Sequence, residues 1–489
     1  MSGEKRIAVV DFGSNTANLA IFVVEPGGAI SCVAERDQPL QLLRRIGPDG
    51  HLPAAAIAAT MQLLRDFVHQ ATTLECDAIE LISTSAVRDA PNSGELVARV
   101  KSELGLTLQV LDGATEARTA VVGVVNTLPL IDGFVIDLGG GSLQITEVEN
   151  RRAARVASLP LGALRLTDQF VRTDPPDGPT VNVLRRHVQR TLETLPWLKN
   201  AGGHVVGVGG SIRTLAKMSR RAAEWPIPHG HGYRLTADDI ESSWELVSRA
   251  DAARRRDIPG LPAHRVDLII AGALVVKQLL RTGGFDGMEV SSSGVREGAA
   301  LMHLLGPEAR VADIREAGLR GRFGGTPEDL AWATRARTSA EALFDALAAG
   351  CPSKPLGLDP TLRDTFAVAA RLRALWERRS PVPGPLSALL ERPIQGFFQR
   401  EVLAVADLVS PVPRLRIDLG IRARLAVLLD LIAAAHGRPL TCVVDADAVR
   451  VGLDARVQAE IVERFGRAFG RPLLVGPYGA PSGTGTTAR

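Results

Sequence analysis

Short apolar runs surround one amphipathic helix in the first 124 residues. The runs are rich in β-branched and aliphatic side chains and predict strands at Ile7–Val10, Ala17–Val24, Ser31–Arg36, Ile79–Thr84 and Leu106–Leu111. Between the third and the fourth run, apolar residues recur at helical spacing after a proline, at Pro53, Ile57, Met61, Leu64 and Val68. Strands and helices mixed in this way predict an α/β domain over residues 1–124.

The same pattern starts again at residue 125. Strands are predicted at Phe134–Asp137, Leu143–Glu149, Arg155–Leu159 and His204–Gly207. The segments 10–16 and 136–142 share one order: a strand end, aspartate, one apolar residue, glycine and small polar residues, with Asp137 following Asp11 by 126 positions. A repeat of this size predicts a second α/β domain over residues 125–306, duplicated from the first and facing it across a cleft.

After residue 306 the chain becomes rich in Ala, Leu and Arg at helical spacing, which predicts a mainly helical domain over residues 307–475. Thr326 is a candidate N-cap, followed by Pro327 at the first helical position. Near the end, Leu440–Val444 and Val449–Leu453 predict a hairpin, and Ala455–Phe469 a helix. Residues 476–489 are mostly Gly, Pro, Ser and Thr, and we expect a disordered tail.

Charge and cysteine content narrow the class of protein. The net charge is only +3, which argues against a protein that coats nucleic acid, so we expect no nucleic-acid partner. The four cysteines are far apart and form no CxxC pair, which indicates neither a zinc site nor a disulfide framework. The longest apolar stretch, Leu268–Val276, is too short for a membrane span, and the four apolar residues between Arg6 and Asp11 are too few to predict a signal peptide. We therefore expect a cytoplasmic protein.

Arginine runs along the chain have two interpretations. They could form a track for a long polyanion, or they could be solvated faces, which is the more common outcome for such runs. The runs are Arg151, Arg152 and Arg155, then Arg185 and Arg186, Arg220 and Arg221, and Arg254 to Arg256.

Each repeated turn has the composition of an anion site. Glycine lets the backbone approach a ligand closely, and successive N–H groups beside hydroxyl and amide side chains form a concave donor surface. The aspartate at each strand end would repel an anion, so its presence points to a cation or a water molecule between them. One such turn alone is more often an ordinary hairpin. Two of them in equivalent places of duplicated domains predict a clamp for a polyanion.

The sequence resembles the exopolyphosphatase and guanosine-pentaphosphate phosphatase family, which has the actin, heat-shock-70 and sugar-kinase superfold. The resemblance covers roughly residues 5–305 and follows the family's order of blocks. The blocks are Val10–Thr16, Thr84–Asn92, Asp112–Arg118, Ile136–Ser142, Ser158–Ala163, Gly207–Arg213, His231–Tyr233 and Ser293–Gly298. It implies two duplicated ribonuclease-H-like, actin-like ATPase domains flanking a cleft, with a mainly helical C-terminal domain.

The resemblance also implies roles for individual residues. Glu116 would accept a proton from the attacking water, and Arg88 would offset charge in the transition state. Phosphate would be bound by Gly13, Ser14, Asn15, Thr16, Asn92, Gly139, Gly140, Gly141, Ser142, Gly210, Ser211 and Arg213. The metal would be Mg²⁺, with Mn²⁺ as the alternative, held by Asp137, Asp11 and Gln144, and no organic cofactor is expected. From the residues alone, a surface glutamate favoured by the helix dipole is the more common outcome for a position like Glu116, and Asn92 could equally be a helix cap.

One position departs from the family pattern. Where the glycine-rich loop of the family usually continues Ser-Thr-Glu, this chain has Ser142-Leu143-Gln144. Glutamine can offer a carbonyl oxygen to a metal but carries no charge. Glu147 is a poor substitute, because side chains alternate along a strand and an odd separation places it on the other face. We expect weaker metal affinity, a different preferred ion or a lower turnover.

The leading hypothesis is an exopolyphosphatase, which releases orthophosphate from the end of inorganic polyphosphate. The closest alternative is the 5′-phosphohydrolysis of guanosine pentaphosphate by the same residues. From another class, a polyphosphate- or nucleotide-binding regulator with weak catalysis stays open because of Gln144. A homodimer is expected from the family. The C-terminal region contains no His-Asp dipeptide and could serve dimerisation, substrate-channel walls or regulation.

Overall fold

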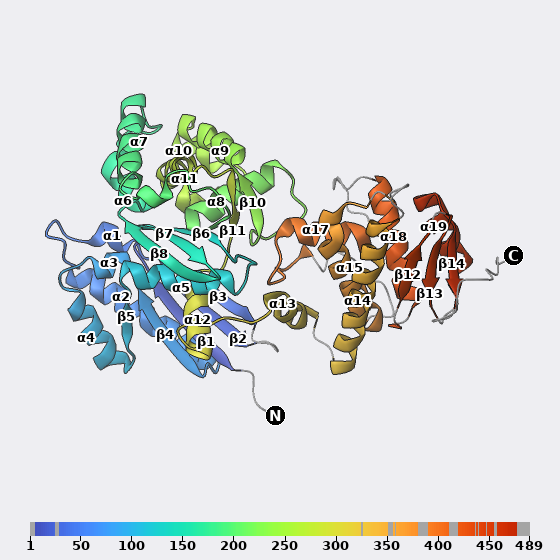
Figure 1. The fold of residues 1–489 in the computed structure, drawn as a ribbon. Coiled ribbons are helices and arrows are strands. Elements are labelled where there is room, and N and C mark those ends of the chain that lie inside the picture. Colours follow the sequence, from blue (N-terminus) through green and yellow to red (C-terminus); the bar gives the residue numbers. More distant parts are fainter. Residues whose placement is uncertain are drawn as a thin grey trace. The chain divides into compact units, whose positions relative to one another are not determined.

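The computed structural model describes residues 5–24, 29–323, 326–350, 356, 358–379, 390–409, 419–435, 437–438, 440–445, 447–453 and 457–476. Two compact units are present. The first comprises Met1–Arg322 together with Pro393–Gln399, and the second comprises Phe323–Arg392 together with Arg400–Arg489. The first unit contains two lobes, each built on its own β-sheet (Figure 1).

The first lobe has a five-stranded sheet in the order β3-β2-β1-β4-β5. Its strands are β1 (Arg6–Phe12), β2 (Thr16–Val24), β3 (Ile30–Pro39), β4 (Ala78–Ser83) and β5 (Leu108–Val110), and its helices are α1 (Leu42–Arg45), α2 (Ala54–Thr73), α3 (Ser85–Arg88) and α4 (Ser93–Leu104). All five expected strands and the expected helix are present. Helices α2 and α4 cover one face, where Met61, Leu64 and Phe67 are buried against Val10 and Leu81.

The second lobe has a six-stranded sheet in the order β10-β11-β9-β6-β7-β8. Its strands are β6 (Gly133–Leu138), β7 (Leu143–Glu149), β8 (Arg152–Leu159), β9 (Val205–Val208), β10 (Tyr233–Thr236) and β11 (Gly287–Val290), and its helices are α6 (Ala163–Phe170), α7 (Gly178–Leu192), α8 (Gly210–Ala222), α9 (Ala237–Arg249), α10 (Ala252–Arg256) and α11 (Ile269–Gly283). The sequence predicted the first four strands but neither β10 nor β11. In both lobes the first two strands form an antiparallel hairpin.

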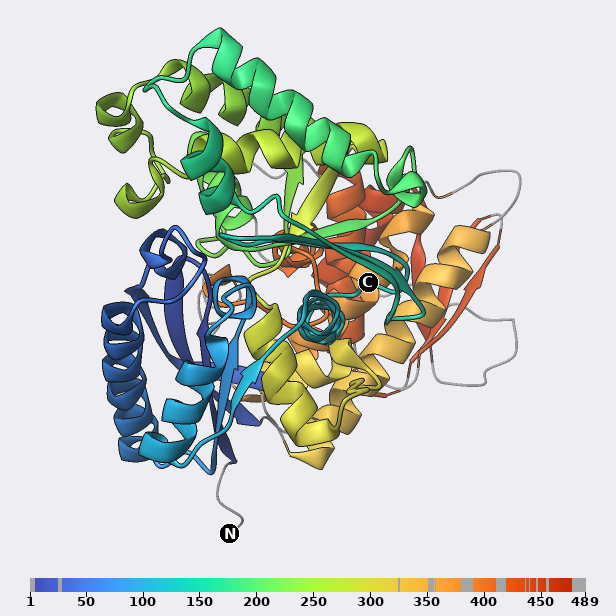
Figure 2. The same ribbon diagram turned by 90° about the vertical axis from the view of Figure 1, so that its left-hand side faces the viewer.

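Two helices lie between the sheets, α5 (Gly113–Val125) and α12 (Val295–Leu305) (Figure 2). Val122 of α5 is buried with Ile82 of the first sheet, whereas Val121 of α5 is buried with Val206 of the second. Leu301 of α12 packs on the first sheet, although α12 falls within the second predicted domain. The expected boundaries at 124/125 and 306/307 stay predictions, because α5 and α12 join both sheets into one unit.

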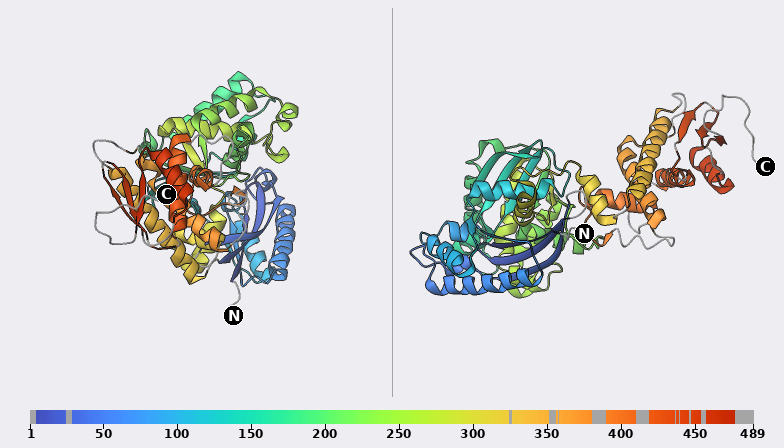
Figure 3. Two further views of the ribbon diagram at one scale, coloured as in Figure 1. Left: turned by 90° about the vertical axis from the view of Figure 1, so that its right-hand side faces the viewer. Right: turned by 90° about the horizontal axis from the view of Figure 1, so that it is seen from below.

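The second unit is largely helical, as expected. Its elements are α14 (Pro327–Ala349), α15 (Arg363–Arg379), α18 (Leu419–Ala434), α19 (Ala459–Phe469), β12 (Thr441–Val444), β13 (Val449–Gly452) and β14 (Leu473–Gly476), while α13 (Ile314–Phe323) and α17 (Gln399–Val409) adjoin the unit boundaries. Thr326 caps α14 through a reciprocal bond with Asp329, as the N-cap prediction requires. The predicted hairpin is β12–β13, and β14 adds an unpredicted third strand parallel to β13 (Figure 3). Gly476 ends β14, and the rest of the predicted tail lies outside the described residues.

Candidate active site

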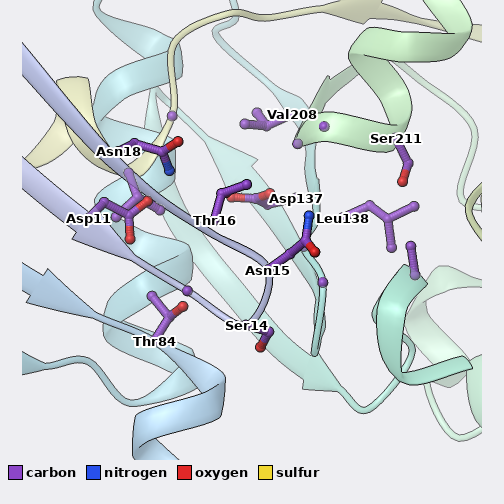
Figure 4. A pocket seen from close by; sticks show the side chains of 18 of the residues that line it. Asp11, Ser14, Asn15, Thr16, Asn18, Thr84, Asp137, Leu138, Val208 and Ser211 are labelled. Carbon is purple, nitrogen blue, oxygen red and sulfur yellow. The ribbon is translucent and has the colours of Figure 1, made fainter. Parts of the chain in front are cut away.

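A pocket of about 320 Å³ lies between the two lobes of the first unit. The tip of the β1–β2 hairpin and the tip of the β6–β7 hairpin both line it, and Glu116 of α5 and the start of α8 complete its wall. Figure 4 shows Asp11, Asn15 and Thr16 of the first lobe in the same space as Asp137 and Ser211 of the second. The prediction that two matched loops face one gap therefore holds in the structure.

The two hairpins are equivalent residue by residue. Asp11 pairs with Asn18 across β1–β2, and Asp137 pairs with Gln144 across β6–β7, so each aspartate has a carboxamide opposite it. The two loops also touch. A Cβ added to Gly140 would lie 3.3 Å from Cβ of Ser14, so this close approach leaves little room beyond a glycine.

Glu116 lies in the first turn of α5, whose N-cap is Asp112. Its carboxylate accepts a hydrogen bond from Arg88 Nη1 at 2.8 Å and one from Gln144 Nε2 at 3.2 Å. The residue is 7% exposed. The pKa of Glu116 is raised to about 8, mainly by burial; Arg88 opposes the shift, and the negative charges of Asp137 and Asp11 add to it. Glu116 is thus a carboxylate tuned for proton transfer near neutral pH.

Asp11 and Asp137 are partly exposed to the pocket and enclosed by protein elsewhere. Burial raises the pKa of each to about 6, and the charge of Asp137 contributes to the shift at Asp11. Two buried acceptor oxygens at this place, Asp11 Oδ1 and Gln144 Oε1, have no hydrogen-bond partner. Two carboxylates at one pocket, with one unsatisfied carboxylate oxygen and one unsatisfied carboxamide oxygen, are a donor set that a hard divalent cation would suit. Across the described ranges, no group of three or more His, Cys, Asp or Glu side chains surrounds a common point.

The pocket lining also includes cationic side chains. Arg213, near the start of α8, and Arg265 both line the pocket, and neither guanidinium has a partner among the described residues. Burial and the charge of Arg213 lower the pKa of Arg265 to about 10, so Arg265 remains a cation at neutral pH. Arg296 also lines the pocket, but its Nη1 is paired with Glu35 at 2.6 Å. Two unpaired guanidinium groups suit an anionic ligand.

The structure brings most predicted site residues to this pocket and leaves four outside its lining. Those at the pocket are Asp11, Gly13, Ser14, Asn15, Thr16, Glu116, Asp137, Gly139, Gly140, Ser142, Gly210, Ser211 and Arg213. Gly141 stands in the sequence between two lining residues but does not line the pocket itself, and it packs against Ser14 and Ser85. Arg88 and Gln144 lie behind Glu116 and hold its carboxylate, so Arg88 is placed to orient Glu116 rather than to contact phosphate directly.

Asn92 is the predicted phosphate ligand that lies away from the pocket. Its Oδ1 accepts from the backbone N–H of Leu52 at 2.8 Å, and its Nδ2 donates to the carbonyl of Leu52 at 3.0 Å. Its side chain makes no cap hydrogen bond to α4. The amide is therefore engaged in fastening the loop before α2 to the start of α4, and the phosphate role has no support from its position.

Members of three of the four arginine runs are paired within the protein. Arg255 is buried and pairs with Asp174, Arg155 pairs with Glu147, and Arg220 donates to the carbonyls of Ile227 and Pro228. None of the run members lines the pocket. The pairing of Arg155 with Glu147 also agrees with the prediction that Glu147 points away from the metal ligands.

Several lining residues were not among the predicted site residues, and Asn18 and Arg265 are two of them. Asn18 could have been found, because the 126-residue offset between the repeats relates it to Gln144. Arg265 had no such signal: it is the last residue of η2 (Ala263–Arg265), in a segment without a motif, and only the fold brings it to the same pocket as Arg213.

Comparison with known proteins agrees with this geometry. The Ppx/GppA phosphatase family model matches residues 20–306. "Exopolyphosphatase 1" of Mycobacterium tuberculosis (strain ATCC 25618 / H37Rv) is 30% identical over 342 residues, which are 68% of this chain and 99% of the relative. The crystal structure of the Aquifex aeolicus Ppx/GppA family member is 27% identical with a TM-score of 0.56, covering 63% of this chain and 99% of its own.

A crystal structure of an exopolyphosphatase from Cytophaga hutchinsonii has the same fold, with a TM-score of 0.56 at 22% identity over 63% of this chain and 99% of its own. Among the described residues, no helix has the length and apolar character needed to cross a lipid bilayer. Both the resemblance noted in the sequence and the actin-like α/β architecture with an added helical region are confirmed. The family model spans more than half of the chain, which therefore belongs to the Ppx/GppA phosphatase family.

Proposed function

We propose that this member of the family is an exopolyphosphatase, a hydrolase that removes the terminal phosphate of inorganic polyphosphate as orthophosphate. The observation that carries the proposal is the position of Glu116. This buried carboxylate lines the same pocket as both glycine-containing loops and the unpaired guanidinium groups of Arg213 and Arg265. A base beside a polyanion clamp is what hydrolysis of a phosphoanhydride requires.

Each group at the pocket has its own role in the hydrolysis. The loop N–H groups and the two guanidinium groups bind the terminal phosphates, and they become more effective as charge shifts onto the leaving oxygen. Glu116 accepts a proton from a water molecule aligned with the terminal phosphorus. Arg88 and Gln144 keep the carboxylate of Glu116 in one orientation through hydrogen bonds of 2.8 and 3.2 Å. Attack by the water oxygen breaks the bond to the bridging oxygen and yields orthophosphate and a chain shorter by one phosphate.

The donor set at the pocket supports a requirement for Mg²⁺. Asp11, Asp137 and the carbonyl oxygen of Gln144 would hold the ion, since Asp11 Oδ1 and Gln144 Oε1 are buried without partners. When bound, Mg²⁺ would neutralise phosphate charge and lower the repulsion between substrate and the two aspartates. Asn18, the counterpart of Gln144 in the first hairpin, offers a further neutral oxygen at the pocket.

The deciding experiment measures orthophosphate release with Mg²⁺ from long-chain polyphosphate, tripolyphosphate and guanosine pentaphosphate. Glu116→Gln keeps the shape of the side chain but removes the base, so turnover should fall by about a hundredfold or more. Glu95→Gln is the matched control, because Glu95 also lies in the first turn of a helix but is exposed and away from the pocket. Unchanged turnover in Glu116→Gln would remove this residue from the mechanism.

The substrate comparison also separates the two activities of the family. Faster release from polyphosphate than from guanosine pentaphosphate is expected, because the pocket offers cationic and main-chain donors along its walls. Among the described residues, no Phe, Tyr or Trp ring on which a guanine base could stack lines it. The reverse preference would assign the chain to guanosine-pentaphosphate hydrolysis. Phosphate binding without turnover would make it a polyphosphate- or nucleotide-binding regulator. A homodimer and a cytoplasmic location stay predictions from the sequence.

A further inference from the structure

The second phosphate loop is held from behind by helix α6. The backbone N–H of Ala163 donates to the carbonyl of Gly139 at 3.0 Å, and that of Arg165 donates to the carbonyl of Gly140 at 3.0 Å. The side chain of Arg165 continues the series, with Nε donating to the carbonyl of Gly141 at 2.8 Å. All three carbonyls of the loop therefore point toward α6.

This arrangement fixes where the loop donors point. In a trans peptide the carbonyl and the following N–H point in opposite directions, so the N–H groups of Gly140, Gly141 and Ser142 point away from α6. None of the three donates to another group in the part of the chain that the structure describes. Gly140 and Ser142 line the pocket, which places the free donors at the phosphate side.

The first loop is held in the same way by α1. The N–H groups of Leu40 and Gln41 donate to the carbonyl of Asn15 at 3.0 and 2.8 Å, and that of Leu43 donates to the carbonyl of Ser14 at 3.1 Å. Gln41 adopts a left-handed conformation, with φ 47° and ψ 43°, which is unfavourable for a residue with a side chain. A strained residue at this point indicates that the backing of the loop dictates the local backbone.

Ion pairs join the two backing helices across the cleft. Arg44 of α1 donates from Nη2 to Asp168 of α6 at 2.9 Å and to Asp267 at 2.9 Å, and its Nε also faces Asp168 at 3.1 Å. Arg165, one turn before Asp168 on α6, pairs from Nη2 with Asp89 of the first lobe at 2.7 Å. Helix α6 thus contributes the acidic partner, Asp168, to one ion pair and the basic partner, Arg165, to the other.

We propose that Arg44 and Arg165 are positioning residues of the phosphohydrolase, and that their ion pairs with Asp168 and Asp89 set the spacing at which the two loops close on one phosphate chain. The proposal rests on the proposed function, because it explains how the phosphate donors are brought together. Neither side chain lines the pocket, so both act through the loops. Loss of the α1–α6 pair should therefore weaken substrate binding while Glu116 keeps its surroundings.

A double-mutant cycle tests the α1–α6 pair in the full chain with Arg44→Ala, Asp168→Ala and the double variant. Each single variant should raise KM for tripolyphosphate by about threefold to tenfold, with kcat within about twofold of the wild type. Because Arg44 also pairs with Asp267, the double variant should resemble Arg44→Ala. The control is Arg363→Ala with Asp345→Ala, a forked arginine–aspartate pair of the second unit, which should leave KM unchanged.

Arg165→Lys supplies the second arm. Lysine keeps the charge opposite Asp89 but cannot also reach the carbonyl of Gly141 as the fork does, so KM should rise although the ion pair remains. Unchanged KM in the Arg44 and Arg165 variants, or strictly additive effects in the cycle, would overturn the proposal.

Tripolyphosphate binding measured by calorimetry separates this failure from that of the proposed function. A wild-type chain that binds and hydrolyses tripolyphosphate, with no coupling in the cycle, would disprove only the positioning role. A wild-type chain that neither binds nor hydrolyses it would disprove both.

Discussion

At the scale of single residues, Gln144 affects both the orientation of the base and the candidate metal site, although its side chain is neutral. Its Nε2 donates to Glu116 and to the hydroxyl groups of Ser142 and Ser158, while its Oε1 is buried without a partner. One end of the amide thus steadies the base, and the other end is available to a cation. A glutamate at this position would offer a stronger metal ligand but would place a second negative charge beside Glu116.

Gln144→Glu should therefore change two properties in opposite senses. The added charge lies about one hydrogen bond from Glu116 and raises the pKa of that carboxyl above its present value of about 8. Since Glu116 must be deprotonated to act as a base, the rising, acid-side limb of the pH–rate profile should move to higher pH. The Mg²⁺ concentration for half-maximal rate should fall, because the new ligand is charged.

The measurements are rate against pH at saturating Mg²⁺ and rate against Mg²⁺ at fixed pH. Gln109→Glu is the matched control, because Gln109 also donates to a glutamate, Glu80 at 2.7 Å, but on the exposed side of β5. A limb that does not move in Gln144→Glu would show that Glu116 does not set the pH dependence.

At the scale of elements, the position of Glu116 depends on how closely α5 and α12 pack. A Cβ added to Gly298 of α12 would overlap the backbone carbonyl of Thr119 on α5, and one added to Gly123 would overlap that of Gly294. Two glycines thus allow the backbones of the helices to touch. Because α5 begins beside the pocket and carries Glu116 in its first turn, any separation of these helices shifts the base.

Gly298→Ala should destabilise the first unit by about 1–3 kcal/mol, the range for overpacking a tight contact, and should lower kcat by moving α5. Gly94→Ala is the control, since Gly94 lies in α4 with no atom within 4 Å of an added Cβ. That change should stabilise the chain by up to about 1 kcal/mol through the helical preference of alanine. Urea unfolding and initial rates test both variants, and equal stability of the two would contradict the packing argument.

The same scale shows what a sequence can predict. Long periodic elements such as α2 and the two loop hairpins were predictable, because spacing and turn residues encode them locally. The strands β10, β11 and β14 were not predicted, and none of the three is joined to its partner strand by a tight turn. Side-chain destinations were equally hidden: the partner of Asn92 is Leu52, and nothing near Arg265 in the sequence indicates that it lies beside Arg213.

At the scale of the whole molecule, the chain returns briefly to its first unit between the two segments that form its second unit. Within the returning segment Pro393–Gln399, Gly396 donates its N–H to the carbonyl of Thr127 at 2.8 Å. Gln399 is 2% exposed; its Nε2 donates to the carbonyls of His229 and His231, and its Oε1 accepts from Trp225 Nε1 at 2.7 Å. His231 in turn contacts Ser292, which lines the pocket. The segment is thus part of the first unit's structure.

Gln399→Ala should release this segment. It leaves buried carbonyl and indole N–H groups without partners, at a cost of about 2 kcal/mol or more. Hydrogen exchange provides the local measurement: the amides of Gly396 and Gln399, bonded to Thr127 and Gly232, should exchange faster than in the wild type. Gln62→Ala, which loses only exposed bonds to Asp66 and from Arg65, should leave them unchanged. Equal protection in both variants would show that Gln399 does not hold the segment.

The backing of both phosphate loops by neighbouring helices has a consequence for how this chain can diverge. Donors supplied by the peptide backbone belong to every amino acid except proline, so replacement of a loop side chain cannot delete them. Phosphate binding by the loops should therefore tolerate substitutions in evolution, whereas the turnover rate should change with substitutions at positions such as 144. Related proteins can therefore differ in turnover rate while all of them still bind phosphate.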